Sequence, residues 1–190
     1  MNKLLIFDLD GTLVDCKQLH RDAFRSAIGG KWYPEDRVEG LPTIEKIKIL
    51  QDLHYYLNPP QVMTEKARLT AELFDEYIQY NPELNKRLSE LSQQYDLALC
   101  SNAVRPFVER CVDTLNIRLL LSCGIWTATE YPAKPNVTMW QSCIESWAGE
   151  LTNVTIFEDS PVGIMGARSV GCGVVEVQDS VDLLRKLDDF

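Results

Sequence analysis

The stretch that decides the fold is residues 4–12, which read LLIFDLDGT. The apolar residues predict a buried strand, and Gly11 predicts a turn at its end. Side chains at positions i and i+2 of an extended chain point the same way, so the carboxylates of Asp8 and Asp10 are expected to converge. Two carboxylates held close together repel each other and require a divalent cation or a shared proton. Oxygen ligands suit Mg²⁺, which commonly binds together with phosphate, so metal-assisted phosphate chemistry is the first hypothesis.

Composition narrows the class of protein. The chain has 190 residues, of which 45% are hydrophobic and 25% are charged, as expected for a globular domain with a modest insertion. Its net charge of −9 argues against a nucleic-acid partner, which would require clustered Lys and Arg. Asp8 and Asp10 interrupt the early apolar stretch, and no apolar run approaches membrane-spanning length. We therefore expect a cytoplasmic protein with no membrane partner, whose six scattered cysteines are mostly buried thiols.

Short apolar runs alternate with helical patterns along the chain, which favours a parallel α/β sheet. The predicted strands are Leu4–Phe7, Leu97–Cys100, a strand around Leu121–Ile125, Val154–Phe157 and Gly173–Val177. Residues 16–81 contain no convincing strand and instead carry helical patterns over 19–28, 43–56 and 61–80. We predict a sheet domain formed by residues 1–15 and 82–190, split after its first strand by an all-helical subdomain of residues 16–81. An insertion beside the acidic site is well placed to act as a lid.

Other chemical groups follow the later strands. Ser101 ends the second strand, at the edge where open α/β sheets bind ligands. Lys134 precedes a proline that suits the first turn of a helix. Glu158 and Asp159 end the fourth strand, and Ser160 can cap the helix that follows.

Taken singly, these residues have ordinary explanations. Ser101 could be a helix cap, Lys134 a surface lysine, and the acidic pair a complement to a helix N-terminus. Taken together they form a working site. A cation held by Asp8, Asp10 and Glu158 or Asp159 relieves the repulsion between a carboxylate and a phosphate, and Asp10 is expected to use its backbone carbonyl for this. Lys134 adds a fixed positive charge, and Ser101 donates a hydrogen bond to a phosphoryl oxygen.

This set resembles the haloacid dehalogenase superfamily over the whole chain. Residues 8–12 resemble its D-x-D-G-T signature, Ser101 its second motif, Lys134 its third, and Glu158-Asp159 its acidic fourth motif. The resemblance implies that Asp8 is the nucleophile that forms an aspartyl-phosphate, and that Asp10 is the general acid and base. It also implies a Rossmann-like parallel core and Mg²⁺ as cofactor. Asp10 is absent from the dehalogenases, so a phosphotransferase or a phosphatase is implied.

The helical insertion resembles the cap of the β-phosphoglucomutase-like branch. His20 matches a cap-entrance histidine of the mutases, which makes it a candidate for binding the substrate or its phosphate, with a structural role as the alternative. Thr43 and Gln79 stand about where the mutases carry cations that grip a second phosphate, which favours simple hydrolysis. Asn102 could contact substrate or stabilise its loop.

The predicted function is therefore a Mg²⁺-dependent phosphohydrolase acting on a small phosphomonoester, either a phosphosugar or a nucleoside monophosphate. The chain is expected to be a monomer or a homodimer. A phosphosugar mutase is the main alternative, and a non-catalytic phospho-aspartyl binding module is a weaker one.

Overall fold

The structure, a computed structural model, describes residues 3–38 and 41–190. It divides into two compact units. One unit combines Met1–Asp15 with Gln79–Phe190, and the other is Cys16–Ile78.

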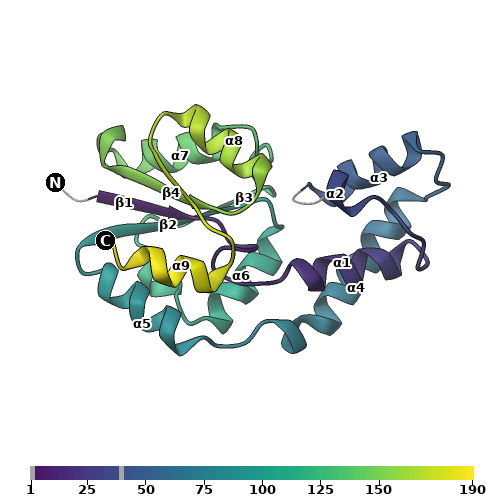
Figure 1. Ribbon diagram of the computed structural model, residues 1–190, viewed down its shortest axis with the longest axis horizontal. Helices are drawn as coiled ribbons and strands as arrows, with labels where there is room; N and C mark the ends of the chain where they lie inside the picture. The colour runs from purple at the N-terminus through teal and green to yellow at the C-terminus, as the bar shows by residue number, and fades with distance from the viewer. Residues whose placement is uncertain (1–2, 39–40) are drawn as a thin grey trace. The chain divides into compact units, whose positions relative to one another are not determined.

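The first unit is built on a five-stranded parallel sheet with the strand order β3-β2-β1-β4-β5 (Figure 1). The strands are β1 (Lys3–Phe7), β2 (Tyr95–Ser101), β3 (Ile125–Thr127), β4 (Val154–Glu158) and β5 (Gly173–Glu176). Leu5 pairs with Leu97 on one side and with Thr155 on the other, so β1 is the central strand. A central parallel strand is buried on both faces, which explains why residues 4–7 are uniformly apolar. The predicted parallel α/β core is confirmed.

Helices cover both faces of this sheet (Figure 1). Helices α7 and α8 lie on one face, and α5, α6 and α9 lie on the other. Their bounds are α5 (Pro82–Leu91), α6 (Arg105–Thr114), α7 (Thr138–Trp147), α8 (Pro161–Val170) and α9 (Ser180–Leu187). Two short 3₁₀ turns, at Arg118–Leu120 and Leu151–Asn153, lead into β3 and β4. Helix α8 begins as expected: Ser160 Oγ accepts a hydrogen bond from Gly163 N, and Pro161 is the first helical residue.

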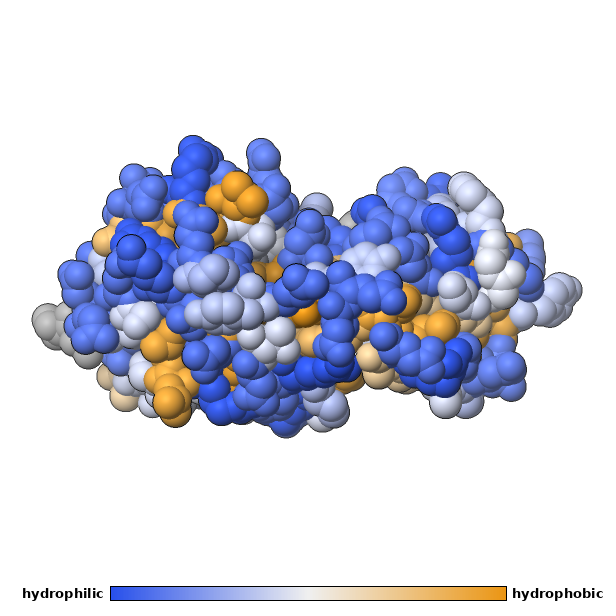
Figure 2. Space-filling view, turned by 90° about the horizontal axis from the view of Figure 1, so that it is seen from below, coloured by the Kyte–Doolittle hydropathy of each residue, from blue (hydrophilic) through white to orange (hydrophobic). Residues whose placement is uncertain are grey.

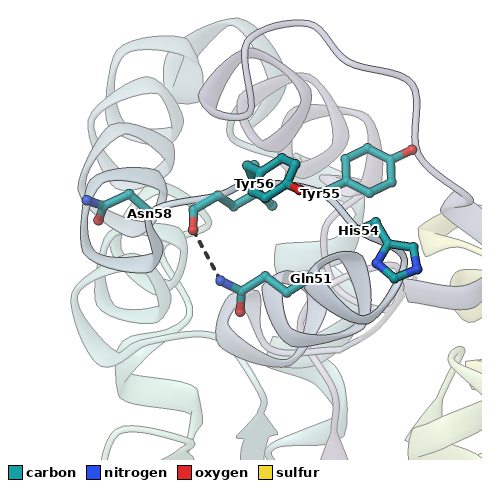
Figure 3. A pocket seen from close by; sticks show the side chains of 6 residues that line it. Gln51, His54, Tyr55, Tyr56 and Asn58 are labelled. Carbon is teal, nitrogen blue, oxygen red and sulfur yellow. Dashed lines mark hydrogen bonds between the residues drawn. The ribbon is translucent and has the colours of Figure 1, made fainter.

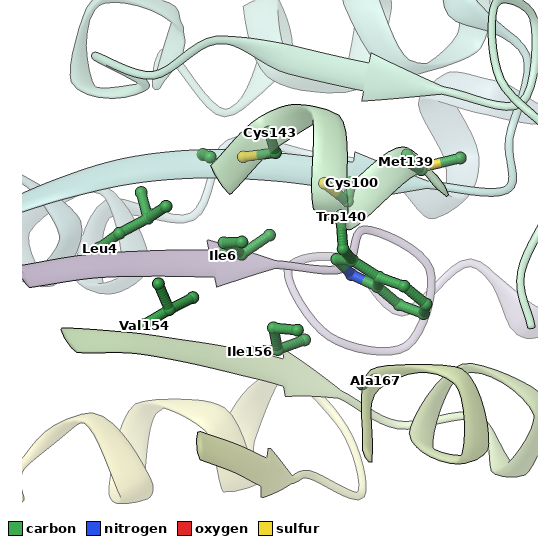
Figure 4. Close-up of a cluster of buried hydrophobic side chains, with 10 residues drawn as sticks. Leu4, Ile6, Cys100, Met139, Trp140, Cys143, Val154, Ile156 and Ala167 are labelled. Carbon is green, nitrogen blue, oxygen red and sulfur yellow. The ribbon is translucent and has the colours of Figure 1, made fainter. Parts of the chain in front are cut away.

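The main hydrophobic core lies between the sheet and the α7–α8 layer (Figure 4). It includes Leu4 and Ile6 of β1, Val154 and Ile156 of β4, and Trp140 of α7. Because side chains alternate along a strand, the residue two positions beyond Ile6 or Ile156 is directed to this same face. Those residues are Asp8 and Glu158, so the strand pattern sends both carboxylates toward the α7–α8 layer.

The second unit is all-helical, with α1 (Lys17–Ala27), α2 (Glu35–Val38), α3 (Thr43–Asp52) and α4 (Pro59–Tyr77). Helices α1 and α4 pack against each other, and a core of aliphatic and aromatic side chains around Phe24, Ile47 and Leu50 holds the unit together. Asn58 caps α4 by accepting a hydrogen bond from Gln61 N, with prolines in the first turn.

Two predicted elements are misplaced. The third strand runs over Ile125–Thr127 and not over 121–125, because a 3₁₀ turn and Gly124, with φ of +88°, place a tight turn there. The helix predicted over 43–56 ends at Asp52, because His54 adopts φ of +66°, outside the helical region. The cysteines follow expectation: all six are free, and four of them are buried.

The surface drawn in Figure 2 is largely hydrophilic, with apolar side chains in separate small patches. A shallow surface pocket in the helical unit is lined by Gln51, His54, Tyr55, Tyr56 and their neighbours (Figure 3). Gln51 closes one side by donating a hydrogen bond to Leu57 O at 3.1 Å. None of the predicted site residues lines this pocket. Of the helices in the described part of the chain, none combines the length and the apolar character needed to cross a bilayer.

Candidate active site

Three adjacent strands end in polar residues at the same edge of the sheet. Asp8 follows β1, Ser101 is the last residue of β2, and Glu158 is the last residue of β4. Strand β1 lies between β2 and β4 in the sheet. Since all three strands are parallel, their carboxyl ends share one edge, where α/β sheets of this type bind ligands.

Lys134 joins two of these carboxylates. Its Nζ donates hydrogen bonds to Asp8 Oδ1 at 2.5 Å and to Glu158 Oε2 at 2.6 Å. All three side chains are buried, with residue exposures of 3% for Lys134, 6% for Asp8 and 1% for Glu158. The alternative that Lys134 is a surface lysine is therefore wrong. Charge-assisted hydrogen bonds of this kind fix both the position and the ionisation of the ammonium.

Negative charge exceeds positive charge at this edge. Ligand oxygens of Asp8, Glu158 and Asp159 lie within 4.8 Å of one another, and the ammonium of Lys134 binds the first two of these side chains. Burial, followed by repulsion from Glu158, raises the pKa of Asp8 well above its usual range, and Lys134 offsets only part of this. Burial lowers the pKa of Lys134, but the carboxylates of Asp8 and Glu158 raise it more, so its pKa ends above the usual value and the ammonium stays protonated.

This donor set fits a hard divalent cation. A cluster of two buried carboxylates and one partly buried carboxylate is a suitable environment for an ion such as Mg²⁺. Asp8 and Asp159 could contribute ligands to such an ion. Both oxygens of Glu158 already have partners, because Oε1 accepts hydrogen bonds from Ser160 Oγ at 3.0 Å and Ser160 N at 3.2 Å while Oε2 binds Lys134.

Helix α8 packs closely against Glu158. A Cβ atom on Gly163 would lie 2.1 Å from Glu158 Cδ, which no real contact allows. The side chain of Ser160 bridges the two elements, since its Oγ donates to Glu158 Oε1 and accepts from Gly163 N. Glu158 is thus held by its own strand, by the first turn of α8 and by Lys134.

The loop after β1 is tightly closed. Gly11, with φ of +87°, donates a hydrogen bond from its amide to Val14 O at 2.7 Å. Thr12 is completely buried, and its Oγ1 donates to Asp159 Oδ1 at 3.4 Å. This link between the first and fourth motifs was missed in the sequence, although the threonine follows the two acids directly. Asp10 is half-buried in this loop, and its backbone pairs with that of Val14. Its carboxylate is not part of the cluster formed by Asp8, Glu158 and Asp159.

Asn102 binds the backbone of Lys134 at both ends of that residue. Its Oδ1 accepts a hydrogen bond from Lys134 N at 2.7 Å, and its Nδ2 donates to Lys134 O at 3.3 Å. The prediction that a helix starts at Pro135 is wrong: the Lys134–Pro135 peptide bond is cis, and α7 begins at Thr138, whose amide donates to Asn136 Oδ1. The loop is shaped by these side-chain contacts, which no local sequence pattern reveals.

Ser101 is buried at the end of β2, and its Oγ accepts a hydrogen bond from Ala103 N at 3.0 Å. That bond occupies an acceptor position of the hydroxyl, whose proton remains a donor group. His20 belongs to the helical unit, where its Nδ1 lies 3.4 Å from Lys66 Nζ. Its role toward substrate stays a prediction.

Comparison with known proteins agrees with this geometry. Residues 5–177 match the family described as haloacid dehalogenase-like hydrolase. This chain belongs to that family. The match includes residues of all five strands and the polar residues at their carboxyl ends, so the chain is a haloacid dehalogenase-like enzyme in both its sequence and its fold.

Two relatives of the haloacid dehalogenase-like chain carry functional names. It is 29% identical over 179 residues to a "phosphorylated carbohydrates phosphatase" of Thermotoga maritima, covering 88% of this chain and 81% of the relative. It is 23% identical over 180 residues to the "fructose-1-phosphate phosphatase YqaB" of Escherichia coli, covering 92% and 95%.

Solved structures share the fold. A hydrolase from Pseudomonas syringae superposes with a TM-score of 0.82 at 17% identity, covering 100% of this chain and 99% of that one. The β-phosphoglucomutase of Clostridium difficile superposes with a TM-score of 0.79 at 21% identity, covering 96% and 87%.

Proposed function

We propose that this chain is a phosphatase that hydrolyses a small phosphomonoester through a covalent intermediate on Asp8. The observation that carries the proposal is the environment of Asp8, a buried carboxylate 2.5 Å from the ammonium of Lys134 and clustered with Glu158 and Asp159. Two further carboxylates beside a buried aspartate are unfavourable for a purely structural role, but they suit a site where a cation and the ammonium of Lys134 offset the charge of a bound phosphate.

The proposed reaction has two halves. A carboxylate oxygen of Asp8 attacks the phosphorus, the bond from phosphorus to the leaving oxygen breaks, and Asp10 donates a proton to the leaving alcohol. Asp10 then takes a proton from a water molecule, which attacks the aspartyl-phosphate and releases inorganic phosphate and free Asp8. Lys134 and the hydroxyl of Ser101 bind the phosphoryl oxygens during both halves.

We propose that Mg²⁺ is the cofactor and that Asp8 and Asp159 hold it, with the backbone carbonyl of Asp10 as the third ligand from the chain. When bound, the ion supplies positive charge that offsets the repulsion between Asp8 and the phosphate dianion. Glu158 instead keeps Lys134 in place, which agrees with its complete set of hydrogen-bond partners.

For the substrate we propose a phosphorylated sugar ahead of a nucleoside monophosphate. The names of the two relatives both describe phosphatases of phosphorylated carbohydrates, and both alignments span most of either chain. We also propose that the inserted helices serve as the cap that selects the substrate. Hydrolysis is favoured over mutase action because Thr43 and Gln79 supply no positive charge for a second phosphate.

The test is a panel of sugar phosphates and nucleoside monophosphates assayed for phosphate release with Mg²⁺ or with EDTA. Asp8→Asn should lose about 10⁴-fold or more in kcat, because the nucleophile is gone. Asp189→Asn, at an exposed position near the C-terminus, is the matched control and should keep the wild-type rate. Undiminished turnover in Asp8→Asn contradicts the assigned nucleophile, and a requirement for a bisphosphate activator indicates a mutase.

A further inference from the structure

Trp140 of α7 lies directly beside the ammonium of Lys134. The Nζ atom of Lys134 is 5.1 Å from the centroid of the indole ring, within the range of a cation–π contact. Trp140 is completely buried, and Figure 4 shows it at the end of the core cluster, beyond Ile6 and Ile156 in the direction of the strand ends. The ring therefore forms part of the wall behind the candidate active site.

The indole N–H of Trp140 makes no hydrogen bond within the described residues. A buried tryptophan usually finds an acceptor for this group, and leaving it without one destabilises the folded state. The indole N–H therefore does not explain why tryptophan occupies position 140. The aromatic ring does, because the negative charge on its face attracts the ammonium of Lys134.

Helix α8 holds the ring in place from another direction. A Cβ atom on Gly166 would lie 2.8 Å from Trp140 Cζ3 and 2.7 Å from the carbonyl oxygen of Pro135. Glycine at this position allows α8 to pack directly against the ring and against the loop that carries Lys134. The ring is consequently confined between α8 and the ammonium.

We propose that Trp140 is a positioning residue whose ring keeps the ammonium of Lys134 between Asp8 and Glu158. Asn102 fixes the backbone of Lys134, and its two carboxylate partners attract the ammonium from the side of the site. The ring supplies the remaining contact, from the core. The expected effect of this role on turnover rests on the proposed phosphatase function.

The test compares Trp140→Phe with Trp140→Met. Only Phe retains an aromatic face, and the same comparison without the ammonium of Lys134 accounts for the difference in volume between Phe and Met. We expect kcat of the Met variant to be about tenfold below that of the Phe variant, with KM changed about twofold or less. In a Lys134→Met background, which lacks the ammonium, the ratio of the two rates should fall to near one. A ratio that is the same in both backgrounds means that Trp140 acts by packing alone and overturns the proposal.

Trp147→Phe is the matched control on the same helix. Its indole donates a hydrogen bond to Asp96 Oδ2 at 3.0 Å, so this variant should lose thermal stability but keep the wild-type kcat. A similar loss of kcat in Trp147→Phe would show that any damage to α7 slows the enzyme, and would overturn the specific role of Trp140.

A thermal version of the same cycle separates this inference from the proposed function. If no phosphomonoester is hydrolysed, the proposed function fails, but the Tm difference between the Phe and Met variants still reports the contact with Lys134. That difference should become smaller when Lys134 is replaced by Met, and an unchanged difference overturns the inference. Should Lys134→Met not fold, the Asp8→Asn/Lys134→Met background removes one of the unpaired carboxylates and serves instead.

Discussion

The carboxylate of Glu158 lies where the side chain of any larger residue at Gly163 would have to lie. A Cβ at position 163 would be 2.4 Å from both carboxylate oxygens of Glu158, one of which binds Lys134. The start of α8 is therefore part of the support of the candidate site, although Gly163 itself has no chemical group to offer.

Gly163→Ala is the first prediction. The added methyl group should displace Glu158 and with it Lys134, so we expect kcat to fall by about 10- to 100-fold. Overpacking costs about 1–3 kcal/mol and exceeds the roughly 1 kcal/mol gained from the helix propensity of alanine, so Tm should fall as well. Steady-state kinetics and thermal unfolding measure the two effects. Ser169→Ala, on the exposed side of the same helix, is the control.

Lys134→Met is expected to damage both activity and stability. Loss of the fixed cation should lower kcat by about 10²- to 10³-fold. Because Asp8 and Glu158 are left buried without their partner, the free energy of unfolding should fall by about 3–5 kcal/mol. Chemical denaturation measures this loss, and adding Asp8→Asn should restore part of it.

The control for that variant is Lys86→Met. Lys86 pairs with Glu90 at 3.9 Å on the exposed side of α5, and removal of such a pair should change stability by less than about 1 kcal/mol. An equal decrease in the free energy of unfolding in the two lysine variants would mean that the buried ion pairs of Lys134 stabilise the fold no more than an exposed pair does.

Asn102→Ala distinguishes a loop-stabilising residue from a substrate contact. Since both amide atoms of Asn102 bind the backbone of Lys134, the variant should lower kcat by about tenfold and leave KM nearly unchanged. Asn102→Asp keeps the acceptor for Lys134 N but has no donor for Lys134 O, so its kcat should be intermediate. An increase in KM at constant kcat would instead assign Asn102 to substrate binding.

Mg²⁺ should raise the Tm of the wild-type protein, because it neutralises the clustered carboxylates of Asp8, Glu158 and Asp159. The effect should be larger at pH 8 than at pH 5. Burial and Glu158 raise the pKa of Asp8, so as the pH falls Asp8 binds a proton that the cation must displace. Differential scanning fluorimetry over a Mg²⁺ series at both pH values measures this.

Asp159→Asn should weaken this Mg²⁺ response, whereas Asp189→Asn should leave it intact. A Tm shift of equal size in wild type and in Asp159→Asn would remove Asp159 from the proposed metal ligands.

The sequence predicted those parts of the site that belong to strand ends. Asp8, Ser101 and Glu158 each follow or end an apolar run, and parallel strands bring such ends to one edge, so their proximity could be inferred without coordinates. The burial of Lys134 could not, because its loop is shaped by Asn102, which is 32 residues away in the chain.

Close contacts between segments that are distant in the chain also could not be predicted from the sequence. Gly163 and Gly166 look like ordinary small residues of a helix, and Trp140 looks like an ordinary core residue. Their importance comes from the atoms that face them across the α7–α8 layer. The third strand was misplaced for a related reason, since the turn at Gly124 and not the apolar run decides where pairing with β2 begins.

The central position of β1 has a consequence for biosynthesis. Of the five strands of the sheet β1 is synthesised first, but β4, one of its two neighbours in the sheet, is synthesised fourth. Until then β1 has an open apolar edge, and Asp8 lacks Glu158 and Asp159. A product terminated before β4 is therefore expected to be inert and prone to self-association, so the nascent chain gains its chemistry only once β4 has been made.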